Sequence, residues 1–206
     1  MRYRCPFCGY WRADPTIINE WDAVIPPPAP ELKSIYVDPK STALLILDME
    51  NSICNKHRCV ASIPRIKSLL NKARQAGMLV VYSLTRTGNI ADINQHLSPY
   101  TTDPIVKSNV DKFYETNLED ILRKHHIQNV IITGYAANGA VLHTAVAAAF
   151  RGYQVAVPVD GMSAAHLYPE QYTAWHLLHS PGSRDQAVLT RTDLISISSE
   201  PSNHVK

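Results

Sequence analysis

The sequence predicts an α/β fold in which helices cover both faces of a parallel sheet. From residue 42 onward, short apolar runs alternate with amphipathic helical patterns, which is typical of successive βαβ units. The first run, residues 42–48, is apolar without alternation, as expected of a strand buried on both faces. With 206 residues the chain is long enough for one such domain, and a core of that size needs no disulfide or metal.

The first half of the domain contains three expected strands and two expected helices. The strands are residues 42–48, 78–84 and 105–107. An amphipathic pattern over residues 62–76, followed by Gly77, predicts the first helix and its end. Thr116 and Glu119 have the spacing of a capping box and predict the start of the second helix.

The second half contains three more strands and two more helices. The strands are residues 129–135, 154–160 and 187–191, the last at the edge of the sheet. Residues 140–151 form an alanine-rich helical pattern, whose small side chains would allow the backbone to pack closely on the sheet. A further helix places Tyr172, Trp175 and Leu178 on one side.

The regions outside these elements predict the domain boundaries. Residues 1–40 are expected to form an N-terminal arm, because the prolines within residues 26–30 favour an extended chain. The domain is expected to span residues 41–197. Residues 198–206 are expected to be a frayed tail.

Charge and hydropathy exclude several classes of partner. Lys and Arg number 20 against 18 Asp and Glu, and no segment concentrates the basic residues, which argues against nucleic acid and anionic membranes. No run approaches the ~18 apolar residues of a membrane span, and the first residues lack the apolar stretch of a signal peptide. We therefore expect a cytoplasmic protein whose cysteines are thiols or metal ligands.

The four cysteines suggest a structural zinc site. Cys5 and Cys8, followed by Gly9, have the spacing of a zinc knuckle, which is half of a tetrahedral site. Cys54 and Cys59 could supply the other half. Four thiolates would leave no open position on the metal, so the zinc would be structural. The alternative is two unrelated pairs of free thiols; no organic cofactor is expected.

Candidate functional residues follow the expected strands, because open parallel sheets bind ligands at the carboxyl ends of their strands. They are Asp48 with Asn51, Arg86, Lys107, the turn at residues 135–140, and Asp160. A carboxylate, a lysine and the amides of a helix start would provide an acid or base, its electrostatic partner and an oxyanion site. Each candidate also has a purely structural interpretation, as a helix cap or a solvated surface charge.

Three segments resemble a known family. They are residues 44–51 (LLILDMEN), residues 106–113 (VKSNVDKF) with Thr116 and Leu118, and residues 130–141 (VIITGYAANGAV). In order and spacing they resemble the signature blocks of the isochorismatase-like hydrolases, a superfamily that includes cysteine hydrolases. The resemblance covers about residues 42–195. It implies a Rossmann-like three-layer α-β-α sandwich with a six-stranded parallel sheet of order 3-2-1-4-5-6, and assembly into a homodimer or homotetramer.

The resemblance also implies roles for individual residues. Asp48 and Lys107 fall on the family's catalytic Asp and Lys, whereas Ala140 stands where the cysteine-dependent members have their nucleophile. Because a methyl group cannot attack a substrate, we expect no covalent intermediate. A cis peptide bond is expected between Tyr135 and Ala136.

The expected substrate is a small, anionic metabolite with an amide or ether bond to be hydrolysed. Substrate contacts are expected from Asn51, Arg86, Tyr135, Ala136, Ala137 and Asn138. Residues 85–92 contain no histidine, which disfavours a nicotinamidase-type metal site. Three explanations of Ala140 stay open. The chain cleaves a vinyl ether with an Asp acid, as isochorismatase-type members do without Cys; it is an amidohydrolase whose nucleophile has been replaced; or it is a noncatalytic small-molecule-binding relative.

Overall fold

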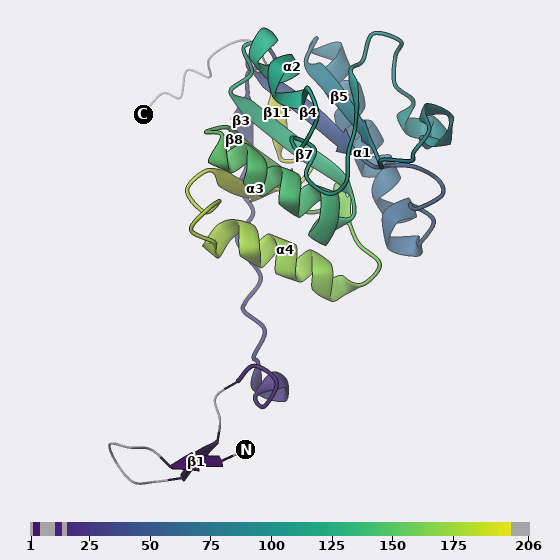
Figure 1. Cartoon of the computed structure of the whole chain (residues 1–206). Helices are drawn as coiled ribbons and strands as arrows, with labels where there is room; N and C mark the ends of the chain where they lie inside the picture. The colour runs from purple at the N-terminus through teal and green to yellow at the C-terminus, as the bar shows by residue number, and fades with distance from the viewer. Residues whose placement is uncertain (1, 5–10, 14–15, 199–206) are drawn as a thin grey trace, which may run out of the picture.

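The computed structural model describes residues 2–4, 11–13 and 16–198. Its centre is a parallel sheet of the strands β4 (Thr42–Leu47), β5 (Leu79–Leu84), β6 (Ile105–Lys107), β7 (Asn129–Tyr135), β8 (Gln154–Pro158) and β10 (Ala187–Thr190). The sheet order is β10-β8-β7-β4-β5-β6, which confirms the predicted order 3-2-1-4-5-6 (Figure 1). A two-residue strand, β9 (Met162–Ser163), adds to the end of β7.

The helices form the two outer layers. α1 (His57–Gln75) packs on one face of the sheet, and α2 (Leu118–Lys124), α3 (Leu142–Phe150) and α4 (Leu167–His179) pack on the other. The central strand β4 is buried along its whole length. Its side chains point alternately to the two faces of the sheet, so that Leu45 packs in the core under α3 and α4 and Ile46 packs in the core under α1. This explains why the run at residues 42–48 shows no polar alternation.

Several element boundaries differ from the sequence expectation. α1 begins at His57 rather than at residue 62, and it contains Pro64. The expected capping box of Thr116 and Glu119 is not formed. The N-cap residue of α2 is Asn117, and the Thr116 hydroxyl accepts a hydrogen bond from the N–H of Leu118 instead of that of Glu119. The helix expected at residues 140–151 begins instead with a wide turn, Ala137–Val141, in which Gly139 leaves helical geometry.

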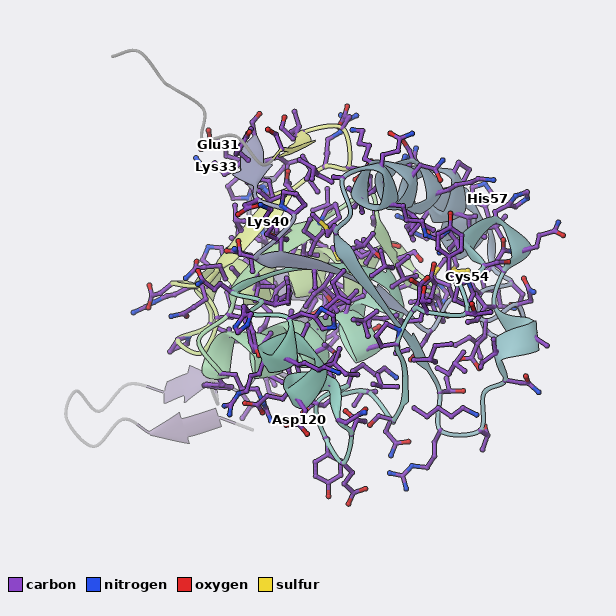
Figure 2. All side chains as sticks on the ribbon, turned by 90° about the horizontal axis from the view of Figure 1, so that it is seen from above. Glu31, Lys33, Lys40, Cys54, His57 and Asp120 are labelled. Carbon is purple, nitrogen blue, oxygen red and sulfur yellow. A yellow bond between two sulfur atoms is a disulfide. The ribbon has the colours of Figure 1, made fainter. Side chains whose placement is uncertain are left out.

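The N-terminal segment is only partly an arm. β3 (Ile35–Val37) pairs in parallel with β11 (Ile195–Ile197) beside the main core, so the end of the range 1–40 belongs to the domain. Before it, the chain with the short helix η1 (Trp21–Ala23) and the hairpin of β1 (Arg2–Arg4) and β2 (Trp11–Ala13) extends away from the domain (Figure 1). Figure 2 shows Glu31 and Lys33 on one side of the domain, and Cys54 with His57, the first residue of α1, on the other.

Within the described residues, no helix is both long and apolar enough to cross a membrane.

Candidate functional site

Asp48 lies at the carboxyl end of the central strand. It directly follows β4, and its main-chain N–H bonds to the carbonyl of Ser83 on the neighbouring strand β5. Its φ of 50° places it in the left-handed region, where Asp is one of the few residues that occur regularly. Only 5% of the residue is exposed, so the carboxyl group lies almost wholly out of water.

Lys112 is the cationic partner of Asp48. Its Nζ lies 2.7 Å from Asp48 Oδ2, and its side chain is 0% exposed. The same ammonium donates to the carbonyl oxygens of Asn109 at 2.5 Å and Ser108 at 3.2 Å. Three close acceptors match the three N–H bonds of an ammonium group, so this buried charge is fully hydrogen-bonded.

Lys107, the lysine that the sequence predicted for this role, lies elsewhere. It is exposed at the end of the edge strand β6, and its Nζ donates to the carbonyl of Gly88 at 2.8 Å. Because side chains alternate along a strand, the burial of Val106 turns Lys107 outward. The expected pairing of Lys107 with Asp48 is therefore wrong, and a lysine five positions later takes that place.

The loop that carries Lys112 is fixed to the start of α3. The N–H of Lys112 donates to Thr144 Oγ1, and the same hydroxyl donates to the carbonyl of Val110. Sequence reasoning missed Lys112 because it lies in an irregular segment between β6 and α2, where no periodicity predicts burial. The only sequence signal is its place directly before Phe113, an apolar residue of the resembling block that the structure buries.

Ser83 was also missed. It is buried in β5, and its hydroxyl donates to Asp48 Oδ1 at 2.6 Å. The two carboxylate oxygens of Asp48 therefore have different partners, a hydroxyl and an ammonium. Burial raises the pKa of Asp48 above its ordinary value, while Lys112 and the Ser83 hydrogen bond pull it down and the nearby Glu50 carboxylate adds to the rise.

Glu50 is a second buried carboxylate at this edge. Its Oε2 accepts the N–H of Thr85 at 2.8 Å and its Oε1 accepts the Thr85 hydroxyl at 3.1 Å. Gly88 lies so close that a β-carbon there would be 2.0 Å from Glu50 Oε1. Lys107, at the surface, donates a hydrogen bond to the carbonyl of the same glycine.

The turn after β7 lies next to Asp48, because β4 and β7 are neighbours in the sheet. The peptide bond between Tyr135 and Ala136 is cis, as expected. Ala137 and Ala140 are buried, and the amides of Gly139 and Val141 both bond to the carbonyl of Ala136. At Ala137 and Ala140 the turn therefore has only small, buried side chains beside its backbone.

Ser163 stands beside the turn and pairs in register with Tyr135. It is 2% exposed, and its hydroxyl has no hydrogen-bond partner among the described residues. A buried hydroxyl without a partner is uncommon, so this group offers a hydrogen bond close to the turn.

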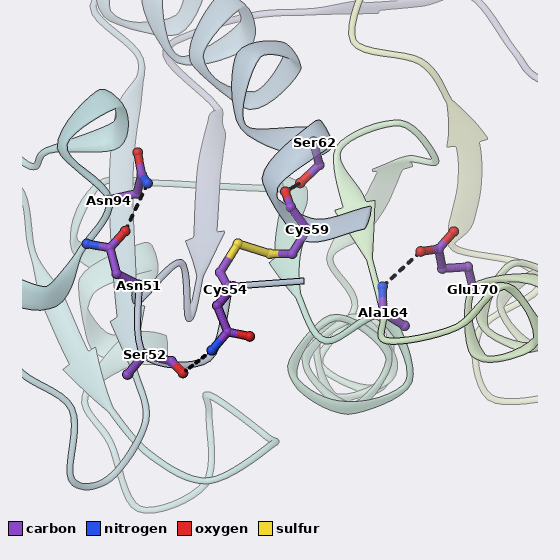
Figure 3. The surroundings of a disulfide bond; sticks show 9 residues. Asn51, Ser52, Cys54, Cys59, Ser62, Asn94, Ala164 and Glu170 are labelled. Atoms are coloured by element: carbon purple, nitrogen blue, oxygen red, sulfur yellow. Dashed lines mark hydrogen bonds between the residues drawn. A yellow bond between two sulfur atoms is a disulfide. The ribbon is translucent and has the colours of Figure 1, made fainter. Parts of the chain in front are cut away.

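The remaining candidates lie at the rim or are structural. Asn51 accepts a hydrogen bond from Asn94 on the adjoining loop (Figure 3). Arg86 pairs at the surface with Glu115, where an ion pair is weak. Asn138 is exposed on the turn. Asp160 accepts hydrogen bonds from the N–H and hydroxyl of Thr192, so it ties two segments together.

The cysteines correct the zinc hypothesis. Cys54 and Cys59 form a disulfide, shown in Figure 3, which joins the loop after Asp48 to the first turn of α1. Disulfide sulfurs are not thiolates, so these two residues do not fit a four-cysteine zinc site, and the expectation of free thiols is wrong for them. Cys5 and Cys8 lie outside the described residues. Within the described part of the chain, no cluster of His, Cys, Asp and Glu could hold a metal.

Comparisons with known proteins agree with this fold. The Isochorismatase domain family model matches residues 42–190. A secreted isochorismatase effector of Verticillium dahliae is 30% identical over 151 residues, which are 63% of this chain and 80% of that protein. An uncharacterised isochorismatase family protein of Bacillus subtilis is 31% identical over 143 residues, 57% of this chain and 78% of that protein. The structure of N-carbamoylsarcosine amidase from Thermoplasma acidophilum is similar with a TM-score of 0.64 at 22% identity, covering 74% of this chain and 97% of that one.

The two lysines predict different effects on stability. Lys112→Met should lower the free energy of unfolding by about 3–5 kcal/mol near neutral pH, because Asp48 loses the partner of a buried charge. The loss should shrink in acid, where Asp48 takes up a proton. Lys107→Met, the matched control at an exposed position, should change it by less than ~0.5 kcal/mol. Urea denaturation followed by circular dichroism measures both, and equal effects would contradict the assignment.

The disulfide predicts a redox-dependent stability. Reducing Cys54–Cys59 should lower the free energy of unfolding by about 2 kcal/mol, as expected for a short closed loop. Peptide mapping after alkylation without reductant should find both residues unmodified. The double variant Cys54→Ser, Cys59→Ser should not respond to reductant. Alkylation of both residues in the denatured, unreduced protein would show that the bond is absent.

Proposed function

The chain belongs to the isochorismatase family, and we propose that it is a hydrolase of a small, anionic metabolite, with Asp48 as general acid and base and without a covalent intermediate. The observation that carries the proposal is the buried pair of Asp48 and Lys112 at the carboxyl edge of the sheet, beside the turn after β7. A polar pair at this place in a parallel sheet is typical of a reaction centre. In this proposal Lys112 takes the part that the resemblance assigned to Lys107, so the Asp–Lys pair is kept with a different lysine.

A vinyl ether is the bond that best suits this set of groups. Asp48 gives its proton to the terminal alkene carbon, and the π electrons form the new C–H bond, which leaves an oxocarbenium ion. Water adds to that ion and returns a proton to Asp48. The resulting hemiketal breaks its C–O bond to give an alcohol and a ketone, so the net reaction consumes one water. No step needs the thiol that Ala140 lacks.

The electrostatics of the pair support the acid role. Burial raises the pKa of Asp48, which keeps more of the acid protonated at a given pH. Lys112 limits that rise and stabilises the carboxylate that remains when the proton leaves. Activity should therefore fall as the pH rises through the pKa of Asp48.

The turn and the rim would bind the substrate. The positive end of the dipole of α3 lies at this turn, which favours an anion there. The unpaired hydroxyl of Ser163 is a further proposed contact, which the sequence did not suggest. The other proposed contacts are Asn51, Arg86, Tyr135, Ala136, Ala137, Asn138 and Ala140. We also propose a homodimer or homotetramer, as the resemblance implies.

The disulfide bears on where in or outside the cell the protein works. A cytoplasmic protein was expected, but the disulfide favours an oxidising environment, and one relative is described as secreted. We therefore propose that the folded chain works where disulfides persist.

A noncatalytic small-molecule-binding protein is the second candidate. Ala140 at the nucleophile position and the near-complete burial of Asp48 both favour it. The two candidates differ in one respect that is easily measured, since only the hydrolase turns its ligand over.

Asp48→Asn should abolish turnover, and because the amide oxygen of Asn can still accept a hydrogen bond from Lys112, the protein should stay folded although less stable. A panel of vinyl ethers of small carboxylic acids, isochorismate included, would be assayed with the unchanged protein and the variant, and loss of the acid should cost at least ~10²-fold in rate. Asp193→Asn, the same change at an exposed position, is the control. Equal turnover by Asp48→Asn would contradict the proposal. Binding of a panel member by thermal shift without turnover would favour the noncatalytic candidate.

Ala140→Cys tests the replaced-nucleophile explanation. If the chain were an amidohydrolase that has lost its thiol, this change would create activity on amides and ureides. We expect no such activity, because the noncovalent route needs no nucleophile from the protein. Release of ammonia or amine from a panel of both classes measures the outcome, and a gain by Ala140→Cys over the unchanged protein would contradict our proposal.

A further inference from the structure

The two oxygens of Asp48 differ in what their partners can do. Lys112 faces Oδ2 at 2.7 Å and can only donate hydrogen bonds. The Ser83 hydroxyl faces Oδ1 at 2.6 Å and can either donate or accept. A proton on Oδ2 would point at an ammonium group, whereas a proton on Oδ1 meets a hydroxyl that can turn to accommodate it. Of the two oxygens, Oδ1 is therefore the one whose partner can accept a proton on Asp48.

Ser83 is held in place at both ends. Its main-chain carbonyl accepts the N–H of Asp48 at 3.2 Å, and it pairs in register with Leu47, the residue before Asp48. It is 1% exposed, so its hydroxyl lies out of bulk water. Two other buried serines bond to main-chain carbonyls nearby in sequence, Ser62 to Cys59 (Figure 3) and Ser183 to Leu177. Ser83 instead reaches a carboxylate 35 residues away.

We propose that Ser83 is a positioning residue for the hydrolysis proposed above: its hydroxyl confines the acid proton of Asp48 to Oδ1 and stabilises the carboxylate formed as that proton moves to the substrate. The proposal rests on the proposed function. No bond to Ser83 is made or broken. Its hydroxyl turns from acceptor to donor while the proton passes from Oδ1 to the substrate.

The chemistry explains why such a contact favours the transition state. A hydrogen bond to an ionised carboxylate is stronger than one to a neutral carboxyl, so the contact gains strength as Asp48 loses its proton. An interaction that strengthens during the reaction accelerates it, whereas one that is equal throughout does not. The other charged groups that act on Asp48 are Lys112 and Glu50, and both stay in place when only Ser83 changes.

The first test needs no substrate. The carbon-13 signal of the Asp48 carboxyl is titrated in the unchanged protein, in Ser83→Ala and in Ser62→Ala, the matched buried serine outside the site. Ser83→Ala should raise the pKa of Asp48, because the ionised form loses a hydrogen bond. Ser62→Ala should not move it. An unmoved pKa in folded Ser83→Ala would overturn the proposal, whether or not the protein is an enzyme.

The second test uses the vinyl ether found in the panel. Ser83→Ala should lower kcat about 10- to 100-fold, and the limb on which activity falls with rising pH should move upward with the pKa. Ser83→Thr, which keeps the hydroxyl, should restore both. A raised pKa with unchanged kcat would overturn the positioning role. If Ser83→Ala does not fold, Ser83→Cys serves instead, since a thiol is a weak donor, and it should raise the pKa likewise.

The two proposals fail separately. Turnover by Asp48→Asn overturns the hydrolytic role of Asp48 but leaves the substrate-free titration as a valid measurement of the hydrogen bond. Loss of turnover in Asp48→Asn with no effect of Ser83→Ala overturns only the role of Ser83.

Discussion

The buried contact between Asp48 and Lys112 is the constraint on which the rest of the site depends. Two charges taken out of water are costly, and their attraction offsets that cost only when their other hydrogen bonds are satisfied. The carbonyls of Ser108 and Asn109 do this for the ammonium, and the Ser83 hydroxyl does it for the carboxylate. A stable pair therefore requires the end of β5 and the loop before α2 to hold their places.

The fold supplies those places by its strand order. Since β4 lies between β5 and β7, the residue that follows it meets both a side chain from β5 and the turn after β7. The loop with Lys112 comes from the sheet edge, beyond β6, and Thr144 on α3 fastens it from the other side. One carboxylate thus connects two strands, a loop and a helix that are far apart in sequence.

The sequence predicted the parts that obey a repeating pattern. Apolar runs identified the six principal strands, and the place of Asp48 after the first of them singled it out, whereas the resemblance supplied the strand order and the cis peptide bond. The sequence did not predict that Lys112 pairs with Asp48. The rule that functional residues follow the carboxyl ends of the strands selects Lys107, whereas Lys112 lies in an irregular loop to which the rule does not apply. Nothing in the sequence distinguishes Ser83 from an ordinary strand residue, and the expectation of a cytoplasmic protein predicts thiols rather than a disulfide at Cys54 and Cys59. In each case the deciding contact joins segments whose separation no periodicity encodes.

Gly88 shows how tightly the edge of the sheet is filled. Because Gly88 has no β-carbon, the Glu50 carboxylate can occupy the space beside it. Any larger residue at position 88 would displace this buried carboxylate. The damage would appear at Thr85, whose N–H and hydroxyl would both lose their acceptor. A change in a surface loop would then be felt at the end of β5, two residues from Ser83, as a defect of the protein interior.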